Sequence, residues 1–363
     1  MNGLARLMRV SGALCLSGWG LLVAAGLGGC SASSPGDGAV DQARLPERDG
    51  VYDAGFPSEG LSEYLQEIGE SVKMVSCIAY YRVYPIPEGD SLLASDITPE
   101  ILEDRRESSY FTNTTSSGTG TIIYFDGFRV ALLTAAHVVS FPETLLAHHY
   151  RSGDRAAPLV RSVSVREKQS IYVAVFPEGG DMEILALDSG SDLVILGKEF
   201  KRSPYRLIRV LEYPFGQARE LGWGAVVYIF GYPSGQQVLT RGIVSKPRRE
   251  GAETFLLDAV LGPGYSGGPA LALRDGLPNF ECVGLITDIS GQTALYLAPE
   301  ETVEYEPGVP YEGEIYIRQR TELAFGGTQA VSAEAVDRFL QAHQSELAGR
   351  GYPVRLRRSS AVQ

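Results

Sequence analysis

Short apolar and β-branched runs, separated by turn-forming residues, fill the chain from about residue 73 to about residue 289. Met74–Tyr84 has the mixture of β-branched and aromatic residues that is typical of a strand. Leu193–Leu196, which follows Asp192 directly, is a short apolar run of the kind that forms a buried strand. Many short strands with turn signals between them predict an all-β sandwich or barrel, and not units in which strands alternate with helices.

Helical spacing occurs on both sides of this β region. The first helical pattern predicts a short amphipathic helix with apolar positions at Leu61, Leu65, Ile68 and Val72. The second predicts a closing helix over residues 333–348, with Ser332 as N-cap and Gly349 near its end. The residues expected to face inward from this second helix are Val336, Phe339 and Leu340.

Two polar stretches interrupt the apolar pattern. Residues 30–58 are rich in Ser, Gly, Pro and charge, which predicts a flexible tether. Residues 85–117 are also polar and are expected to separate the first strand from a glycine-containing strand that begins at Gly118. No repeat period or low-complexity tract is present.

The first 29 residues have the composition of a secretory signal. Arg6 and Arg9 form a positive start and residues 12–27 form an apolar region. The ending Leu27-Gly28-Gly29-Cys30 resembles the bacterial lipobox, which implies cleavage before Cys30 and lipidation of its thiol, with palmitate among the acyl chains. A plain signal peptide or a single transmembrane anchor is the alternative that the residues leave open.

Lipidation of Cys30 would hold the chain at a membrane, because several buried hydrocarbon chains together give stable anchoring. The expected location is therefore extracytoplasmic, as a membrane-anchored lipoprotein of the bacterial cell envelope, with the choice of inner or outer membrane open. Removal of residues 1–29 changes the net charge from −12 to −14, with 30 basic and 44 acidic residues left. Since no long basic run is present, nucleic acid is not an expected partner.

Two cysteines remain after Cys15 in the signal and Cys30 at the lipid site. In an oxidising compartment Cys77 and Cys282 could pair, which would stabilise the fold by roughly 3–5 kcal/mol, or they could be two buried free thiols. No spacing of cysteine and histidine predicts a metal site, and no cofactor is expected.

The candidate chemistry lies in two segments whose central residues, His137 and Ser266, are 129 positions apart. His137 lies in Leu133–Val139, at the end of an apolar run, and Ser266 lies in the glycine-rich segment Gly262–Pro269. A neutral serine is a weak nucleophile, so acyl transfer needs an imidazole to take its proton and a carboxylate to orient that imidazole. Asp192 is the predicted carboxylate, because it stands at the mouth of a buried strand. The alternatives are Asp181 and Asp188.

At these residues the chain resembles the trypsin-like serine proteases of the peptidase S1 family, and most closely the Deg/HtrA-type domain of bacteria. The resemblance covers about residues 70–345, in the chain order His137, Asp192, Ser266. The further matching segments, in the same order as in the family, are Gly118–Ile123, Tyr228–Pro233, Gly242–Ser245 and Cys282–Thr287.

The resemblance implies a chymotrypsin fold for a protease domain over residues 59–345. Two antiparallel six-stranded β-barrels are expected at about residues 70–200 and 201–330, with the closing helix at 333–348 and a C-terminal tail at 349–363. No PDZ module is expected after residue 345, and the oligomeric state is open.

The resemblance also assigns roles. His137 is the general base, Asp192 orients it, and Ser266 is the nucleophile, with the backbone N–H groups of Gly264 and Ser266 as oxyanion hole. Val260, six positions before the nucleophile, is expected at the base of the substrate pocket. One wall of that pocket is expected from Thr287, Asp288 and Ile289. With no carboxylate at its base, the pocket is predicted to take a small or medium aliphatic P1 side chain, and the substrates are polypeptides.

Two features qualify this expectation. Tyr265 precedes the nucleophile where zymogen-activated enzymes carry an aspartate, so activation by propeptide removal is not expected. Residues 290–322 form an acidic, tyrosine-bearing insertion that either shapes the cleft or forms a solvated hairpin. The alternative functions are a catalytically silent trypsin-fold lipoprotein used for binding or scaffolding, and an esterase or other acyl transferase with the same residues.

Overall fold

The computed structural model describes residues 49–55, 60–148, 159–248, 251–298, 308, 310 and 316–359. The chain divides into two compact units, residues 1–45 and 46–363, and the described residues belong to the second unit. The predicted signal, Cys30 and most of the predicted tether lie outside the described residues. No helix in the described part of the chain is long and apolar enough to cross a membrane.

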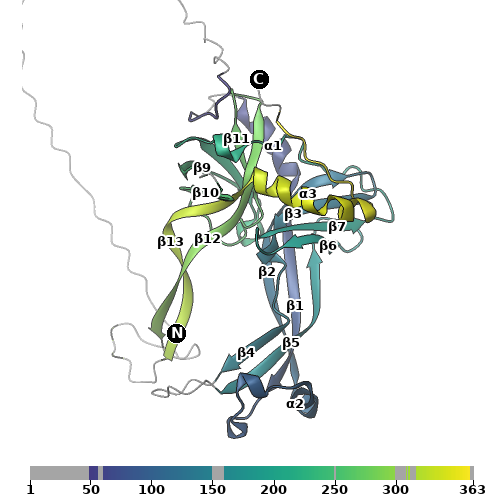
Figure 1. Cartoon of the computed structure of the whole chain (residues 1–363), viewed down its shortest axis with the longest axis vertical. Coiled ribbons are helices and arrows are strands. Elements are labelled where there is room, and N and C mark those ends of the chain that lie inside the picture. Colours follow the sequence, from purple (N-terminus) through teal and green to yellow (C-terminus); the bar gives the residue numbers. More distant parts are fainter. Residues whose placement is uncertain are drawn as a thin grey trace, which may run out of the picture. The chain divides into compact units, whose positions relative to one another are not determined.

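The first barrel is a closed antiparallel sheet in the N-terminal half of the described chain (Figure 1). Its strand order is β1-β2-β3-β7-β6-β5, and pairing of β5 with β1 closes the ring. β4 pairs with the beginning of β5, and β6 pairs with its end. The strands are β1 (Val72–Pro85), β2 (Tyr110–Phe125), β3 (Arg129–Ala135), β4 (Thr144–His148), β5 (Val160–Tyr172), β6 (Asp181–Asp188) and β7 (Leu193–Glu199). Alternate apolar residues of these strands fill the interior, as expected for a small barrel.

The second barrel is also closed and antiparallel, in the order β10-β13-β12-β11-β8-β9. The strands are β8 (Val226–Gly231), β9 (Val238–Lys246), β10 (Thr254–Leu257), β11 (Pro269–Leu273), β12 (Phe280–Ala298) and β13 (Tyr316–Ser332). Apolar residues of these six strands form its core. The predicted architecture of two six-stranded barrels is therefore confirmed.

Two helices lie where the periodicity predicts them, except that Val72, expected on the first helix, begins β1. α1 (Leu61–Glu70) buries Leu65 and Ile68, and α3 (Ala333–Gly349) buries Val336, Phe339 and Leu340. The Ser332 hydroxyl accepts a hydrogen bond from the Ala335 amide at 3.3 Å and so caps α3. The remaining helix is α2 (Pro99–Asp104), and the 3₁₀ turns are η1 (Glu88–Asp90), η2 (Ala94–Asp96), η3 (Arg106–Ser108), η4 (Ala136–Val138), η5 (Ala218–Glu220) and η6 (Pro233–Gly235).

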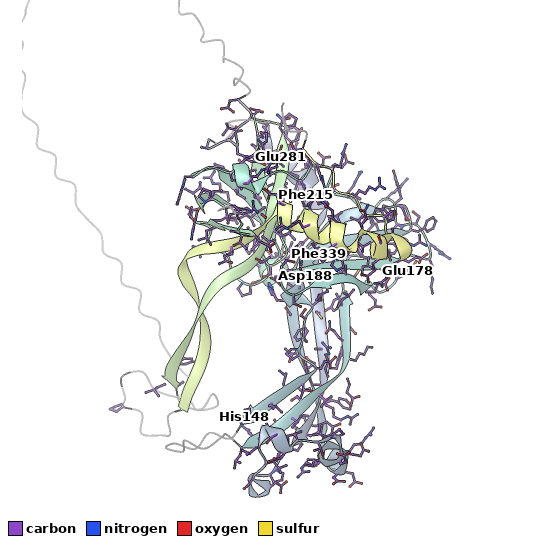
Figure 2. All side chains as sticks on the ribbon, in the orientation of Figure 1. His148, Glu178, Asp188, Phe215, Glu281 and Phe339 are labelled. Carbon is purple, nitrogen blue, oxygen red and sulfur yellow. The ribbon has the colours of Figure 1, made fainter. Side chains whose placement is uncertain are left out.

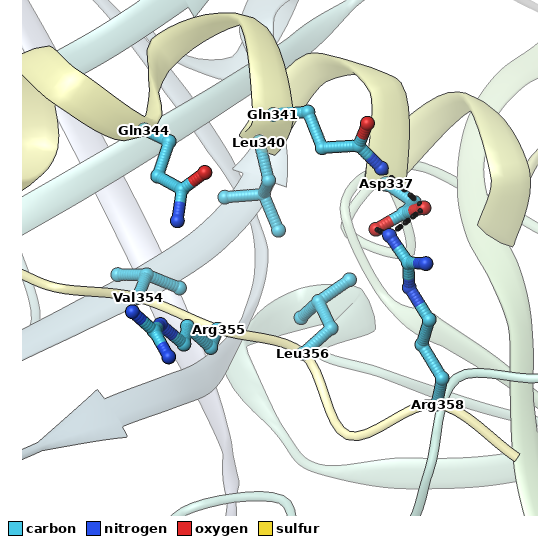
Figure 3. A pocket seen from close by; sticks show the side chains of 8 residues that line it. All are labelled: Asp337, Leu340, Gln341, Gln344, Val354, Arg355, Leu356 and Arg358. Atoms are coloured by element: carbon cyan, nitrogen blue, oxygen red, sulfur yellow. Dashed lines mark hydrogen bonds and ion pairs between the residues drawn. The ribbon is translucent and has the colours of Figure 1, made fainter.

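The segment after α3 packs back against that helix. Figure 3 shows Leu356 and Val354 below Leu340, with Arg358 reaching Asp337 of the helix. The Arg358 guanidinium lies 2.8 Å from Asp337, and Gln341 donates to the same carboxylate at 2.7 Å. Tyr352 and Val354 are buried, so this segment is part of the folded body.

Two strand pairs are longer than the apolar pattern predicts. In the first barrel, β1 continues to Pro85 and β2 begins at Tyr110, with Val83 opposite Tyr110. In the second, β12 and β13 continue past Gly291 as a two-stranded ribbon that Figure 1 shows leaving the barrel. The polar stretch over 85–117 is therefore only partly a separator, because Thr- and Ser-rich residues also pair as exposed strand.

The two cysteines are not paired. Cys77 in β1 and Cys282 in β12 are both buried free thiols, and they lie in different hydrophobic clusters. The disulfide alternative is thus wrong for this structure. Burial raises the pKa of Cys77 to about 11 and that of Cys282 to about 12, so both thiols stay protonated at neutral pH.

Candidate active site

His137 lies two residues beyond the end of β3, in the turn η4. Asp192 holds this turn through three contacts. The Ala136 amide donates to the Asp192 carbonyl at 3.0 Å, and the His137 amide donates to Asp192 Oδ1 at 2.9 Å. His137 Nδ1 lies 2.7 Å from Asp192 Oδ2. Because a carboxylate only accepts, this contact places the proton of neutral His137 on Nδ1 and leaves Nε2 free to act as base.

The structure distinguishes Asp192 from its two alternatives. Asp188 accepts from the Ser191 hydroxyl at 2.6 Å and from the Gly190 amide at 2.9 Å, and these bonds hold the pKa of Asp188 below its usual value. Asp188 therefore shapes the turn that leads to Asp192. Asp181 begins β6, paired with Tyr172 of β5. Asp192 itself has φ +56°, a left-handed conformation that aspartate tolerates better than most residues.

Ser266 is only 7% exposed, in a loop that two glycines shape. Gly264 has φ +103° and Gly267 has φ +83°, so both need the conformational freedom of glycine. A Cβ on Gly267 would lie 2.1 Å from Thr134 Oγ1 in β3. The nucleophile loop therefore contacts the strand end that His137 follows, which brings the serine segment of one barrel to the histidine segment of the other.

Thr119 in β2 holds the nucleophile loop at both ends. Its amide donates to the Ser266 carbonyl at 2.8 Å, and its buried hydroxyl donates to the Gly264 carbonyl at 2.6 Å. The same hydroxyl accepts from the Tyr232 amide at 3.1 Å. Thr119 lies in the matching segment Gly118–Ile123, but the sequence does not reveal this role, although its place between Gly118 and Gly120 is a signal of close backbone approach. A Cβ on Gly118 would lie 2.7 Å from the Ser266 carbonyl oxygen.

The two amides expected to form the oxyanion hole are available. Within the described residues, neither the Gly264 nor the Ser266 amide donates to a protein acceptor. Their neighbours do donate, Gly267 to the Ile286 carbonyl at 2.6 Å and Gly268 to the Tyr265 carbonyl at 2.8 Å. Since buried amides are normally paired, two free amides beside a nucleophile suit a ligand oxygen.

In the part of the chain that the structure describes, the His137 ring and the Ser266 hydroxyl form no hydrogen bond with each other. Catalytic hydrogen bonds are often long without substrate and tighten when it binds, so this does not exclude proton transfer. The His137 side chain is 47% exposed, which leaves it open to substrate and solvent.

Tyr265 faces inward and is buried. Its ring fills the space over Gly231, where a Cβ would lie 2.2 Å from the ring, and burial raises the pKa of its hydroxyl. The side chain before the nucleophile is thus fixed by apolar packing and not by an ion pair.

The prediction for Val260 needs correction. Val260 is 75% exposed, which does not fit the base of a pocket. The neighbouring Ala259 and Leu261 are buried instead, because alternate residues of an extended segment point to opposite sides. Thr287 is buried, while Asp288 and Ile289 pair with Gln329 and Thr328 of β13. The side chains of Asp288 and Ile289 lie outside the described part.

The structure has two closed barrels. A His–Asp pair lies at the end of one barrel, and the glycine-flanked serine loop of the other packs against that end. This is the arrangement of the chymotrypsin-like serine endopeptidases. Residues 118–278 match the family described as "Trypsin-like peptidase domain". The matched segment reaches from β2 to the turn after β11 and includes His137, Asp192 and Ser266.

Among solved structures, the chain is similar to one described as "Crystal structure of the serine endoprotease from Yersinia pestis". The two are 17% identical, the match covers 79% of this chain and 67% of that chain, and the TM-score is 0.35. No curated protein matches the chain.

Proposed function

We propose that this chain hydrolyses peptide bonds of extracytoplasmic polypeptides through the triad His137, Asp192 and Ser266. His137 Nε2 takes the proton from Ser266 Oγ as that oxygen attacks the substrate carbonyl carbon, and the Gly264 and Ser266 amides bind the oxyanion. His137 then protonates the leaving amine, and water releases the acyl group in a second, equivalent step. The observation that carries this proposal is the pair of hydrogen bonds between the Asp192 carboxylate and His137, one to its amide at 2.9 Å and one to its ring Nδ1 at 2.7 Å.

The substrate segment before the scissile bond is assigned to the edge of β12 near Thr287, in line with the resemblance of this segment to the substrate-binding strand. We expect a small or medium aliphatic P1 residue. The two buried side chains around position 260, Ala259 and Leu261, are apolar and offer no partner to lysine or arginine. A peptide-library profile dominated by arginine at P1 would contradict this specificity.

The proposed location depends on the N-terminal residues. Arg6, Arg9, the apolar region and Cys30 support export and lipidation, so the enzyme would act at the envelope surface on unfolded or locally exposed chains. Mass spectrometry of Cys30 in the membrane fraction tests this part separately from catalysis.

The decisive experiment for the chemistry is labelling of a chain that begins after Cys30 with a fluorophosphonate, followed by peptide mapping. Label on Ser266 that is absent from Ser266→Ala and His137→Ala establishes an activated nucleophile. A folded protein that takes no label would instead favour the silent, scaffolding alternative, for which the missing His137–Ser266 hydrogen bond in the described part is the supporting observation.

A further inference from the structure

The 139–142 segment, which consists of Val139, Ser140, Phe141 and Pro142, follows the turn that carries His137 and forms neither helix nor strand. Its carbonyl groups therefore have no place in a strand ladder. Within the described residues, no backbone amide donates to the carbonyl of Val139, Phe141 or Pro142. Since backbone carbonyls of a folded chain are normally paired, partners of another kind are expected here.

Two side chains of β5 supply partners for the first two of these carbonyls. The Gln169 side-chain amide donates to the Val139 carbonyl at 2.6 Å, and the Arg166 guanidinium donates to the Phe141 carbonyl. Arg166 also donates to the side-chain oxygen of Gln169 at 2.8 Å. Because this bond occupies the oxygen end of the Gln169 amide, the NH₂ end faces the Val139 carbonyl. The two side chains thus form one connected network on the segment.

A bulge in β5 brings the two side chains to the same face. In a regular strand, residues three positions apart point to opposite faces. The register of β5 against β1 shifts at Glu167, which has no partner residue. As a result Gln169 lies opposite Ala79, and Arg166 lies opposite Tyr81. Ala79 and Tyr81 are both buried, on one face of β1, so the extra residue turns both polar side chains toward the interior.

Apolar packing does not hold the segment on its other side. A pocket of about 520 Å³ lies there, lined by Val139 and Phe141 of the segment and by Ile184 and Leu187 of β6, among others. Ile184 and Leu187 are each 36% exposed, so they do not close over the segment. The position of the 139–142 segment therefore depends on its hydrogen bonds.

The position of this segment affects the catalytic pair through Val138. Val138 stands between His137 and Val139 and is 1% exposed. A Cβ on Gly118 would lie 2.5 Å from the Val138 side chain and 2.7 Å from the Ser266 carbonyl oxygen. The turn is thus packed against the strand that holds the nucleophile loop. Because only one residue separates them, a shift of Val139 changes the position of His137 relative to Ser266.

We propose that Gln169 and Arg166 are positioning residues for His137. The inference rests on the proposed function, in which His137 takes the proton of Ser266. Asp192 fixes the imidazole and the amide of His137, whereas the backbone that follows His137 is fixed from β5. Gln169 and Arg166 act through this backbone and not on the substrate. Their effect on rate can be large, since a displacement of 1 Å in a catalytic site can cost about 100-fold.

Gln169→Met tests the inference, because methionine has nearly the same length but cannot donate to the Val139 carbonyl. We expect kcat on one peptide to fall about tenfold while KM stays within about twofold. The rate of fluorophosphonate labelling of Ser266 should fall by the same factor, since both reactions need His137 as base. A loss in KM alone, or unchanged kcat and labelling, overturns the inference.

Gln237→Met is the matched control. The Gln237 side-chain amide makes a bond of the same kind, to the Gly69 carbonyl of α1 at 2.7 Å. This variant should lower Tm as much as Gln169→Met does, while kcat stays within about twofold. Tyr81→Phe removes the 2.8 Å bond to the Pro142 carbonyl, farther along the segment, and should lower kcat less than threefold. Equal losses of kcat in Gln169→Met and Gln237→Met would indicate a general effect of stability and would overturn the inference.

A second pair of variants carries the test if Gln169→Met does not fold. Arg166→Met removes the donor to the Phe141 carbonyl and should lower kcat about tenfold. Arg166→Lys keeps a donor and should recover kcat to within about threefold of the wild type. Equal kcat in the two Arg166 variants contradicts the positioning role. A folded wild-type enzyme that neither cleaves the peptide nor takes the label would overturn the proposed function itself.

Discussion

Thr119 is the residue through which the first barrel positions the nucleophile loop. Its hydroxyl donates to the Gly264 carbonyl and accepts from the Tyr232 amide, at 2.6 and 3.1 Å, while a longer bond of 3.2 Å joins that amide directly to that carbonyl. Valine has nearly the same shape but no hydroxyl, so in Thr119→Val the Gly264 carbonyl keeps only its 3.2 Å bond from the Tyr232 amide, and the Gly264 peptide can turn away from the oxyanion. Loss of an oxyanion donor costs about 10²–10³ in kcat. Since the Gly264 amide is misplaced and not removed, we expect kcat to fall by roughly 10- to 100-fold, with KM changed less than threefold.

The matched control for Thr119→Val is Thr119→Ser, which keeps the hydroxyl and should retain kcat within about threefold. Steady-state kinetics on one peptide, the rate of fluorophosphonate labelling and a thermal melt separate catalysis from folding. Equal losses in both variants, or a loss expressed in KM alone, would show that Thr119 only supports the fold.

The residues of the site differ in how far the sequence reveals them. His137 and Ser266 lie in local segments whose glycine and apolar pattern is visible in the sequence. Asp192 competes with Asp188 four positions away, and only the folded turn shows which carboxylate reaches the imidazole. The expected position of Val260 at the base of the substrate pocket is wrong, because neighbouring side chains of this segment alternate between buried and exposed. The number of residues between Val260 and Ser266 does not determine which of them is buried.

At the scale of elements, a helix or strand can be predicted from the sequence when the residues that stabilise it are close together along the chain. α1 and α3 are recognised from apolar spacing and a cap within a few residues. The long parts of β1 and β2 are not, because a run such as Thr112–Ser117 is polar and becomes strand only through pairing with β1. The same holds for the β12–β13 ribbon, where pairs such as Leu297 with Ile317 form across a separation of 20 positions. Its strand pairing agrees with the hairpin alternative for the insertion.

This ribbon gives an element-scale prediction. In the described part, β12 and β13 beyond Gly291 pair only with each other, whereas Leu285 and Ile286 pair within the barrel. Replacing residues 293–321 by Asn-Gly, which favours a tight hairpin turn, should therefore leave the barrel folded. We expect Tm to change by no more than about 3 °C, because shortening a loop costs little free energy. Differential scanning calorimetry measures this, and a fall above about 10 °C would show that the ribbon supports the barrel core.

At the scale of the folded unit, chain ends far apart in sequence meet at Glu281 of β12. The Tyr52 hydroxyl donates to Glu281 Oε2 at 2.5 Å, and Ser359 also donates to this carboxylate. Arg274 pairs with it at 3.1 Å and donates to the Gly50 carbonyl at 2.5 Å. Glu281, labelled in Figure 2, thus joins the segments before α1 and after α3 to the second barrel. Burial of Tyr52 and its hydrogen bond to Glu281 both raise the pKa of Tyr52.

Glu281→Gln tests this arrangement, because it removes the charge while keeping the size of the side chain. Glu281 and Arg274 are 5% and 12% exposed, and breaking such a buried pair typically costs about 3–5 kcal/mol. Glu220 still lies 2.9 Å from Arg274, so the cost should be near the lower value. We therefore expect Tm to fall by roughly 6–12 °C at about 2–4 °C per kcal/mol. Chymotrypsin cleavage after Tyr52, which is buried in the wild type, should accelerate.

The matched control for Glu281→Gln is Glu253→Gln, which makes the same change in the exposed pair of Glu253 with Arg338, 2.7 Å apart and about half exposed on both sides. Exposed ion pairs contribute little to stability, so this variant should shift Tm by about 1 °C or less. Tyr52→Phe removes two hydrogen bonds, one to Glu281 and one from the Gln217 amide, and should cost about 2 kcal/mol, a Tm change of roughly 4–8 °C. If Glu281→Gln behaves like Glu253→Gln in both the melt and the proteolysis, the carboxylate does not fasten the two ends. The ordered series of three Tm values would instead establish that the end segments are held by a buried charge and not by apolar packing alone.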